Sequence, residues 1–172
     1  MKVLGIDPGL SGAFVLTDGE KMLKAWEMPV SVFGKEKSIA YADVLQLLKP
    51  IAQLDNPHVY LERAIPMAMG SKGAFNYGRG FEAIVIALMT LRMPFTMVEP
   101  TKWAKEMHEG ISADLKPKAK SLIAVKRLYP SLVGLLPSKP KGGLKDGPVD
   151  ALLIAGYGLR RLGKDQTEYD FS

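Results

Sequence analysis

Two short apolar segments, each ending in an acidic residue, constrain the fold of this 172-residue chain most strongly. Residues 2–7 (KVLGID) end in Asp7, and residues 58–62 (HVYLE) end in Glu62. Short runs rich in Val, Leu and Ile are typical of buried β-strands. Because charged side chains are rarely buried without a partner or a metal ion, we expect both strands to end at a polar site.

The remaining apolar patterns predict an α/β fold. Residues 12–16 and 21–28 are expected to be strands joined at the hairpin dipeptide Asp18-Gly19, and residues 95–98 a fifth strand. Helical spacing of apolar residues predicts helices over residues 38–52 with Ser38 as the N-cap, 81–92, from Thr101, 117–128 and 148–162. This order predicts a mixed five-stranded sheet, an antiparallel three-stranded ribbon plus two parallel strands, flanked by helices.

Glycine and proline mark the segments expected to be irregular. Residues 29–37 and the Gly-rich residues 70–80 are predicted to be loops, and residues 130–147, with clustered Pro and Gly, a mobile loop. The length favours a single domain over residues 1–162, with residues 163–172 as a frayed polar tail.

The composition excludes several kinds of site. The chain has no Cys, so it has no disulfide, thiolate metal site or thiol nucleophile, and its two His residues are too few for a multi-histidine metal site. Residues 1–10 reach a charged Asp early, and no apolar run approaches the ~18 residues that a spanning helix needs. A cytoplasmic protein without a membrane partner is expected.

A third acid is the hardest to explain structurally. Asp150 stands inside the apolar run of residues 148–155, and if the two acid-ended strands are neighbours, Asp7 and Glu62 share one end of the sheet. Clustered carboxylates repel one another, and oxygen ligands suit hard cations such as Mg²⁺. Structural alternatives remain open: Asp7 closing a turn, Glu62 pairing with Arg63 or a loop lysine, and Asp146 capping the last helix.

The net charge of +5 is concentrated in one segment. Residues 101–145 hold ten Lys and Arg against three acidic residues, whereas residues 1–100 are balanced at ten of each. Such a segment favours a polyanionic partner, although a solvated lysine-rich face is the alternative.

Several motifs in order resemble one known family. Residues 5–12 (GIDPGLSG), 60–62 (YLE), 76–78 (NYG), 98–100 (VEP) with Trp103, 118–121 (KAKS) and 145–152 (KDGPVDAL) resemble the RuvC family of Holliday junction resolvases, within the RNase H-like superfamily. The resemblance covers about residues 1–160. The Gly-rich stretch and residues 99–103 (EPTKW) look most like phage-encoded members, which implies the cytoplasm of a bacterial host.

The resemblance implies an RNase H-like fold and a homodimeric endonuclease that resolves branched DNA by two-metal-ion hydrolysis, leaving 5′-phosphate ends. Mg²⁺ is the implied cofactor, Mn²⁺ a substitute, and no nucleotide cofactor is needed. The implied metal-binding and catalytic acids are Asp7, Glu62 and Asp150. The usual fourth acid position falls on Gly147, so the neighbouring Asp146 is the candidate fourth ligand.

The resemblance also implies DNA contacts. Lys118 and Lys120 are expected near the scissile phosphate, and Lys102, Lys105, Lys139, Lys141 and Lys145 along the DNA arms. Phe75 is the candidate aromatic residue that enters the junction, with Ile65 in an earlier position.

Three other classes remain as alternatives. One is a flap, branched-DNA or RNA nuclease of the same fold. Another is a catalytically silent DNA-binding module, which three retained acids disfavour. The third is an actin-like ATP-binding protein, which needs a longer chain and a second phosphate loop.

Overall fold

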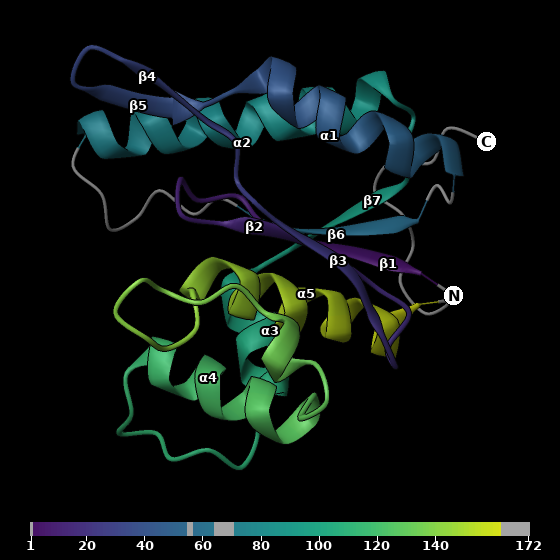
Figure 1. The fold of residues 1–172 in the computed structure, drawn as a ribbon, viewed down its shortest axis with the longest axis vertical. Helices are drawn as coiled ribbons and strands as arrows, with labels where there is room; N and C mark the ends of the chain where they lie inside the picture. Colours follow the sequence, from purple (N-terminus) through teal and green to yellow (C-terminus); the bar gives the residue numbers. More distant parts are fainter. Residues whose placement is uncertain (1, 55–56, 64–70, 163–172) are drawn as a thin grey trace.

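The structure is a computed structural model that describes residues 2–54, 57–63 and 71–162. Its main sheet has five strands in the order β3-β2-β1-β6-β7 (Figure 1). Strands β1, β2 and β3 pair antiparallel, whereas β6 runs parallel to both β1 and β7. The strands are β1 Val3–Asp7, β2 Ala13–Thr17, β3 Met22–Glu27, β6 His58–Glu62 and β7 Phe95–Val98. The predicted mixed five-stranded sheet is confirmed.

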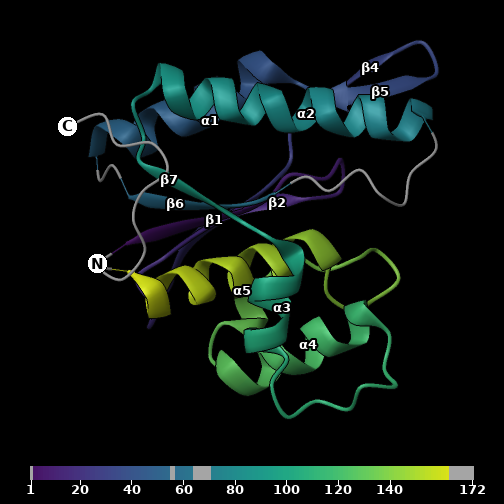
Figure 2. The same ribbon diagram turned by 180° about the vertical axis from the view of Figure 1, so that it is seen from behind.

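Helices cover both faces of this sheet. Helices α1 and α2 lie on one face, and α3, α4 and α5 on the other (Figures 1 and 2). Their bounds are α1 Tyr41–Leu54, α2 Ser71–Thr90, α3 Pro100–Met107, α4 Pro117–Leu128 and α5 Asp146–Arg161, with a short 3₁₀ turn, η2, at Val133–Leu135. No helix within the described ranges is long and apolar enough to cross a membrane.

Alternation along the strands divides the core into two layers. Leu4 and Ile6 of β1 and Leu61 of β6 pack in the cluster under α1 and α2, whereas Val3 and Tyr60 pack in the cluster under α5. Since successive side chains of a strand point to opposite faces, Asp7 and Glu62 belong to the α5 face. The hydrophobic pattern therefore fixes the side of the sheet on which the acids lie.

Helix α5 lies very close to β1. A Cβ atom on Gly5 would overlap the backbone of Ala151 and lie 2.8 Å from the Ala155 Cβ. A Cβ on Gly158 of α5 would overlap the ring of Tyr60, which lies on β6, the strand next to β1. Two glycines thus allow the helix that carries Asp150 to reach the strands that carry Asp7 and Glu62.

Two segments predicted to be loops are regular. Residues 29–37 include most of a hairpin of β4 (Val30–Phe33) and β5 (Glu36–Ile39), whose two-residue turn uses Gly34 at φ 61°. Ser38 lies in β5, so it is not the N-cap of α1, which begins at Tyr41 with the Ala40 carbonyl accepting the Val44 N–H. The sequence prediction failed here because Gly-Lys is a weaker hairpin signal than Asn-Gly.

The Gly-rich residues 71–80 form the first half of α2. Glycine costs a helix about 1 kcal/mol relative to alanine, which favoured the loop prediction. Tertiary packing offsets this cost at Gly80, because a Cβ there would lie 2.8 Å from Ile39 Cδ1 of β5 and a larger residue would not fit without a shift. Residues 130–145 contain η2 and an isolated bridge between Ser138 and Leu144, and their mobility stays a prediction. The predicted tail, residues 163–172, lies outside the described residues.

A substitution at Gly5 tests the close approach of α5. Gly5→Ala is expected to destabilise the fold by about 1–3 kcal/mol, because its methyl group overlaps the α5 backbone. The matched control is Gly78→Ala in α2, where a Cβ meets nothing within 4 Å and helix propensity should add about 0.5–1 kcal/mol. Urea unfolding measures both variants, and equal stability of Gly5→Ala and wild type would contradict the packing argument.

Candidate active site

Three acids lie near one end of the sheet, on the α5 face. Ile6 of β1 pairs with Leu61 of β6, so Asp7 and Glu62 follow at adjacent strand ends. Asp150 lies in the second turn of α5, the helix that packs on β1. The negative charge of Asp7 raises the pKa of both Glu62 and Asp150, which shows that the three carboxylates are electrostatic neighbours.

Burial makes these carboxylates reluctant to ionise. It is the largest cause that raises the pKa of Asp7, partly offset by the Gly9 N–H and the charge of Lys118. Burial, then the charge of Asp7, raises the pKa of Glu62 to about 7. Burial also raises the pKa of Asp150 to about 6. At neutral pH the site therefore favours a positive charge that would compensate the carboxylates.

The donor set fits a hard divalent cation. The Asp150 Oδ1 atom is buried and has no hydrogen-bond partner, so one acceptor of the site is left without a positive group. As the described side chains stand, no three acidic or histidine groups are gathered around a single point. An ion would have to draw the carboxylates together, and an all-oxygen set of this kind suits Mg²⁺ or Mn²⁺.

Asp7 has a structural role as well as a place in the site. Its Oδ1 accepts a hydrogen bond from the Gly9 N–H at 3.1 Å, so the turn-closing interpretation is correct. One carboxylate oxygen makes this bond, and the residue still ends β1 next to Glu62. The two roles are compatible.

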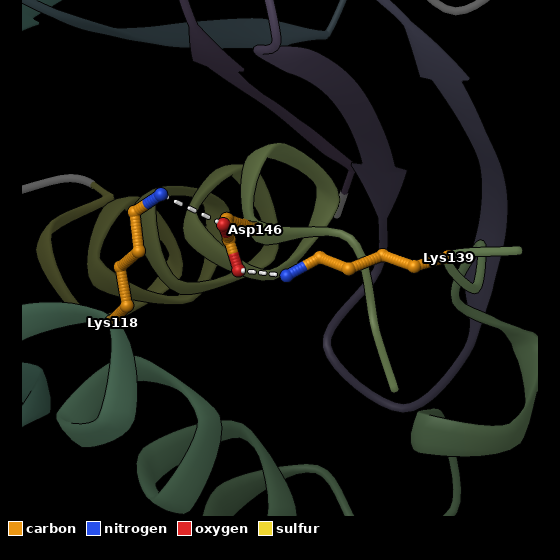
Figure 3. Close-up of polar contacts among 3 residues, drawn as sticks. All are labelled: Lys118, Lys139 and Asp146. Atoms are coloured by element: carbon orange, nitrogen blue, oxygen red, sulfur yellow. Dashed lines mark hydrogen bonds and ion pairs between the residues drawn. The ribbon is translucent and has the colours of Figure 1, made fainter. Parts of the chain in front are cut away.

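Asp146 does not cap α5 through its side chain. The N-cap residue is Lys145, and no side chain makes a capping hydrogen bond there. The Asp146 carboxylate instead bonds Lys118 Nζ and Lys139 Nζ, each at 2.9 Å (Figure 3). These two lysines lower the pKa of Asp146, so it is ionised and held between two cations. The capping alternative is therefore wrong, and the role of metal ligand stays a prediction.

Packing explains the absence of an acid at position 147. A Cβ on Gly147 would overlap the Ser11 carbonyl oxygen and lie 2.8 Å from Gly12 Cα. The start of α5 thus lies against the turn between β1 and β2, and a side chain cannot fit at this position. The nearest acid, Asp146, lies four residues before Asp150, on the same side of the helix.

The predicted DNA-binding residues separate into two groups. Lys118 and Lys139 contact Asp146, and with Ser121 and Asp150 they line one pocket. Lys145 bonds Glu27 at 2.6 Å beside that site, and it lines an adjoining pocket with Lys139. The others are not brought to the acids by any contact in the described chain: Lys102 pairs with Glu99 at 3.6 Å, and Lys105, Lys120 and Lys141 lie elsewhere on α3, on α4 and in the loop before α5.

Phe75 lies in the second turn of α2 and is 64% exposed, with the Arg79 guanidinium 5.6 Å from its ring. An exposed aromatic ring is available for stacking, as the prediction requires. The earlier candidate, Ile65, lies outside the described residues.

Sequence reasoning assigned no role to three residues that surround the acids. Trp103 Nε1 donates a hydrogen bond to Glu62 Oε2 at 2.7 Å, so the alternative pairing of Glu62 with Arg63 or a loop lysine does not describe this contact. Ser121 interacts with Asp150. Tyr77 of α2 is half-buried, and besides burial the charges of Glu62 and Asp7 raise its pKa. Tyr77 was placed in a predicted loop, which hid its position next to the strand ends.

Comparisons with known proteins identify the fold. No protein-family model matches the chain, and no curated protein matches it. Among solved structures, the chain is similar to Thermus thermophilus RuvC in complex with a Holliday junction substrate, with 16% identity, a TM-score of 0.64, and coverage of 97% of this chain and 99% of that one. A second structure of Thermus thermophilus RuvC gives 18% identity and a TM-score of 0.55 with the same coverage. The chain therefore has the RuvC type of RNase H-like fold.

Neutralising Glu62 is expected to stabilise the metal-free protein in a pH-dependent way. The carboxyl has a pKa of about 7 when folded against 4.5 as its reference value, so ionisation destabilises the fold as the pH rises between these values. In EDTA, Glu62→Gln should raise Tm at pH 8 by about 3 °C or more, and change it little at pH 4.5.

The matched control is Glu20→Gln, which changes an exposed carboxylate in the turn before β3 and should alter Tm little at either pH. Thermal unfolding followed by circular dichroism measures each variant. A Glu62→Gln protein that is no more stable than wild type at pH 8 would contradict the electrostatic strain assigned to the site.

Proposed function

We propose that the protein is a structure-selective DNA endonuclease that cleaves four-way, or Holliday, junctions by metal-assisted phosphodiester hydrolysis. One observation carries this proposal: three carboxylates from β1, β6 and α5, with raised pKa values and an unpartnered buried oxygen, meet at one edge of a RuvC-like fold. The structural neighbour solved with a Holliday junction substrate supports this choice of DNA.

Asp7, Glu62 and Asp150 would hold Mg²⁺, with Asp146 as a fourth ligand after it leaves its lysines. When bound, the metal ions activate water and stabilise the leaving 3′ oxygen, which gives a 5′-phosphate end. The protein's own contribution is to hold ionised carboxylates close together in a buried position, which a cation then makes favourable. Mn²⁺ should substitute, because it accepts the same oxygen ligands.

The lysines would bind the phosphate backbone without reading base sequence. Lys118 and Lys139 lie at the acids, so they are the best placed to contact the phosphate that is cut. Lys120 on the same helix as Lys118, and Lys102, Lys105, Lys141 and Lys145 farther along the basic segment, would hold the arms. Phe75 would stack on a base where the strands part.

A second copy of the chain would provide the second cut. A four-way junction has two equivalent strands to be cleaved, and a two-fold dimer matches this symmetry. One face of α2 presents Glu82, Ile86, Met89 and Thr90, and its two large apolar residues, Ile86 and Met89, are 45% and 43% exposed. This face is the proposed homodimer interface.

A cleavage assay with four substrates tests the proposed function. Wild-type protein with Mg²⁺ should cut a four-way junction faster than a flap, a duplex or an RNA hairpin, and EDTA should stop cleavage. Asp7→Asn and Asp150→Asn should each lower the rate by at least about 10³-fold while junction binding persists, because the amide keeps the shape but loses the charge.

Asp43→Asn, a change to an exposed acid in the first turn of α1, is the matched control and should keep full activity. Preferred cutting of flaps or RNA would identify a different nuclease of this fold. Loss of binding together with cleavage in Asp7→Asn and Asp150→Asn would assign the acids a structural role.

Placing a charge on the α2 face tests the dimer. Ile86→Lys should convert the protein into monomers that bind four-way junctions at least tenfold more weakly, as measured by sedimentation and gel shift. Ile123→Lys, at an apolar α4 position of similar exposure (41%), controls for added positive charge and should remain dimeric. A wild-type protein that sediments as a monomer even on a junction would contradict this arrangement.

A further inference from the structure

A series of side-chain contacts, made by residues of α3 and α4, connects two of the three acids. Trp103 of α3 is 5% exposed and donates its indole N–H to Glu62 Oε2 at 2.7 Å. The ring of His108, just after α3, lies edge-on to the Trp103 ring, with centroids 5.7 Å apart and planes at 76°. The series of contacts thus begins at Glu62 and continues through the packed rings of Trp103 and His108.

The same histidine reaches the other acid through a hydroxyl. His108 Nε2 lies 3.1 Å from Ser121 Oγ of α4, and Ser121 is 4% exposed. Ser121 lines the same pocket as Asp150 and its side chain interacts with that carboxyl, whose buried Oδ1 atom has no hydrogen-bond partner. Glu62 on β6 and Asp150 on α5 are therefore joined through three residues that are not themselves acids.

We propose that Trp103, His108 and Ser121 act together as positioning residues that hold Glu62 and Asp150 for a divalent cation. This inference rests on the proposed function. The two acids come from different elements, and their like charges push them apart. A hydrogen bond to one oxygen of each carboxylate restrains its rotation and leaves the other oxygen for a ligand. In known metal sites such outer partners alter metal affinity or activity by 10–100-fold.

The local sequence explains how these groups reach the acids. β7 ends at Val98 beside Glu62, and α3 starts two residues later at Pro100, so its first turn lies next to the β6 strand end. Trp103 and Met107 form the buried face of α3, and His108 follows directly as its C-cap residue. Since α4 packs against α5, Ser121 faces the helix that carries Asp150.

The chain contains a second histidine and a second tryptophan that help to design the test. His58 is the other histidine, and its Nε2 lies 2.9 Å from a threonine hydroxyl, Thr96, at the opposite end of β6 from Glu62. Trp26 on β3 is the other tryptophan. A Trp26→Phe background therefore leaves Trp103 as the single tryptophan, and a change at His58 perturbs a similar bond away from the acids.

The test measures cation binding without DNA. In the Trp26→Phe background, Mg²⁺ or Mn²⁺ titration should change Trp103 fluorescence, because the indole bonds a proposed ligand. Calorimetric titration should give a Kd that rises at least tenfold in Trp103→Phe and in Ser121→Ala, with folding verified by circular dichroism. His108→Leu should weaken binding similarly, whereas His108→Gln, which keeps a polar atom for Ser121, and His58→Gln should stay within about twofold of wild type.

The double variant Trp103→Phe/Ser121→Ala tests whether the residues act together. If the support is one unit, its loss of affinity should be smaller than the product of the two single effects. If the two single effects on Kd multiply in the double variant, Trp103 and Ser121 act independently of each other. Unchanged Kd values in both folded single variants, or a wild-type protein that binds neither cation, would overturn the proposal.

This outcome is distinguishable from failure of the proposed function. Suppose that wild type binds the cation, that the variants lose affinity, and that no branched DNA is cut. The positioning role of the three residues is then supported, and the proposed nuclease activity is contradicted. If junctions are cut normally and the variants bind Mg²⁺ like wild type, the nuclease stands and the support falls.

Discussion

The repulsion among three partly buried carboxylates is the constraint on which the arrangement of this molecule depends. Asp7, Glu62 and Asp150 each have a raised pKa, with burial as the first cause in every case. A chain gains nothing in stability by gathering such groups, so the surrounding structure has to hold them. It does so with a parallel strand pair, a helix packed close to the sheet, and polar neighbours that each satisfy one oxygen.

Small residues make that arrangement sterically possible. Gly5 lets α5 approach β1, Gly158 accommodates the Tyr60 ring, and Gly147 lets the start of α5 lie against the turn after β1. These contacts act on the position of one helix, and that helix carries both Asp146 and Asp150. Close packing and electrostatics thus meet in the same element: the glycines determine where α5 lies, and its position determines the distance over which the acids repel.

Much of the fold could be predicted because the strands carry strong local signals. The apolar runs of β1, β6 and β7 and the helix over Pro117–Leu128 appear where the sequence places them. The β4–β5 hairpin and the first half of α2 could not be predicted, because their stability depends on contacts such as that of Gly80 with Ile39. A single sequence does not reveal such distant neighbours.

The site was predictable to a similar extent. An acid at the end of an apolar strand is visible in the sequence, and Asp7, Glu62 and Asp150 lie within electrostatic range of one another, whereas their role as metal ligands stays a prediction. The neighbours of these acids could not be predicted from the sequence, because Trp103, Ser121 and Tyr77 look like ordinary core or loop residues until the helices are placed. Asp146 shows the limit most clearly: its position before Gly147-Pro148 suggested a cap, whereas its contacts come from lysines 28 and 7 residues away in the chain.

Under the proposed function, the two lysines at Asp146 would also link the binding of ions of opposite sign. In this structure Lys118 and Lys139 both pair with the Asp146 carboxylate, which neutralises part of their positive charge. A polyanion that draws these ammonium groups to itself leaves Asp146 ionised and without a partner, which increases the attraction of the site for a cation. By thermodynamic reciprocity, a cation at Asp146 releases the lysines and strengthens the hold on the polyanion. Under the proposed function, the pairing of Lys118 and Lys139 with Asp146 would therefore make each ligand favour the binding of the other, without a change of fold.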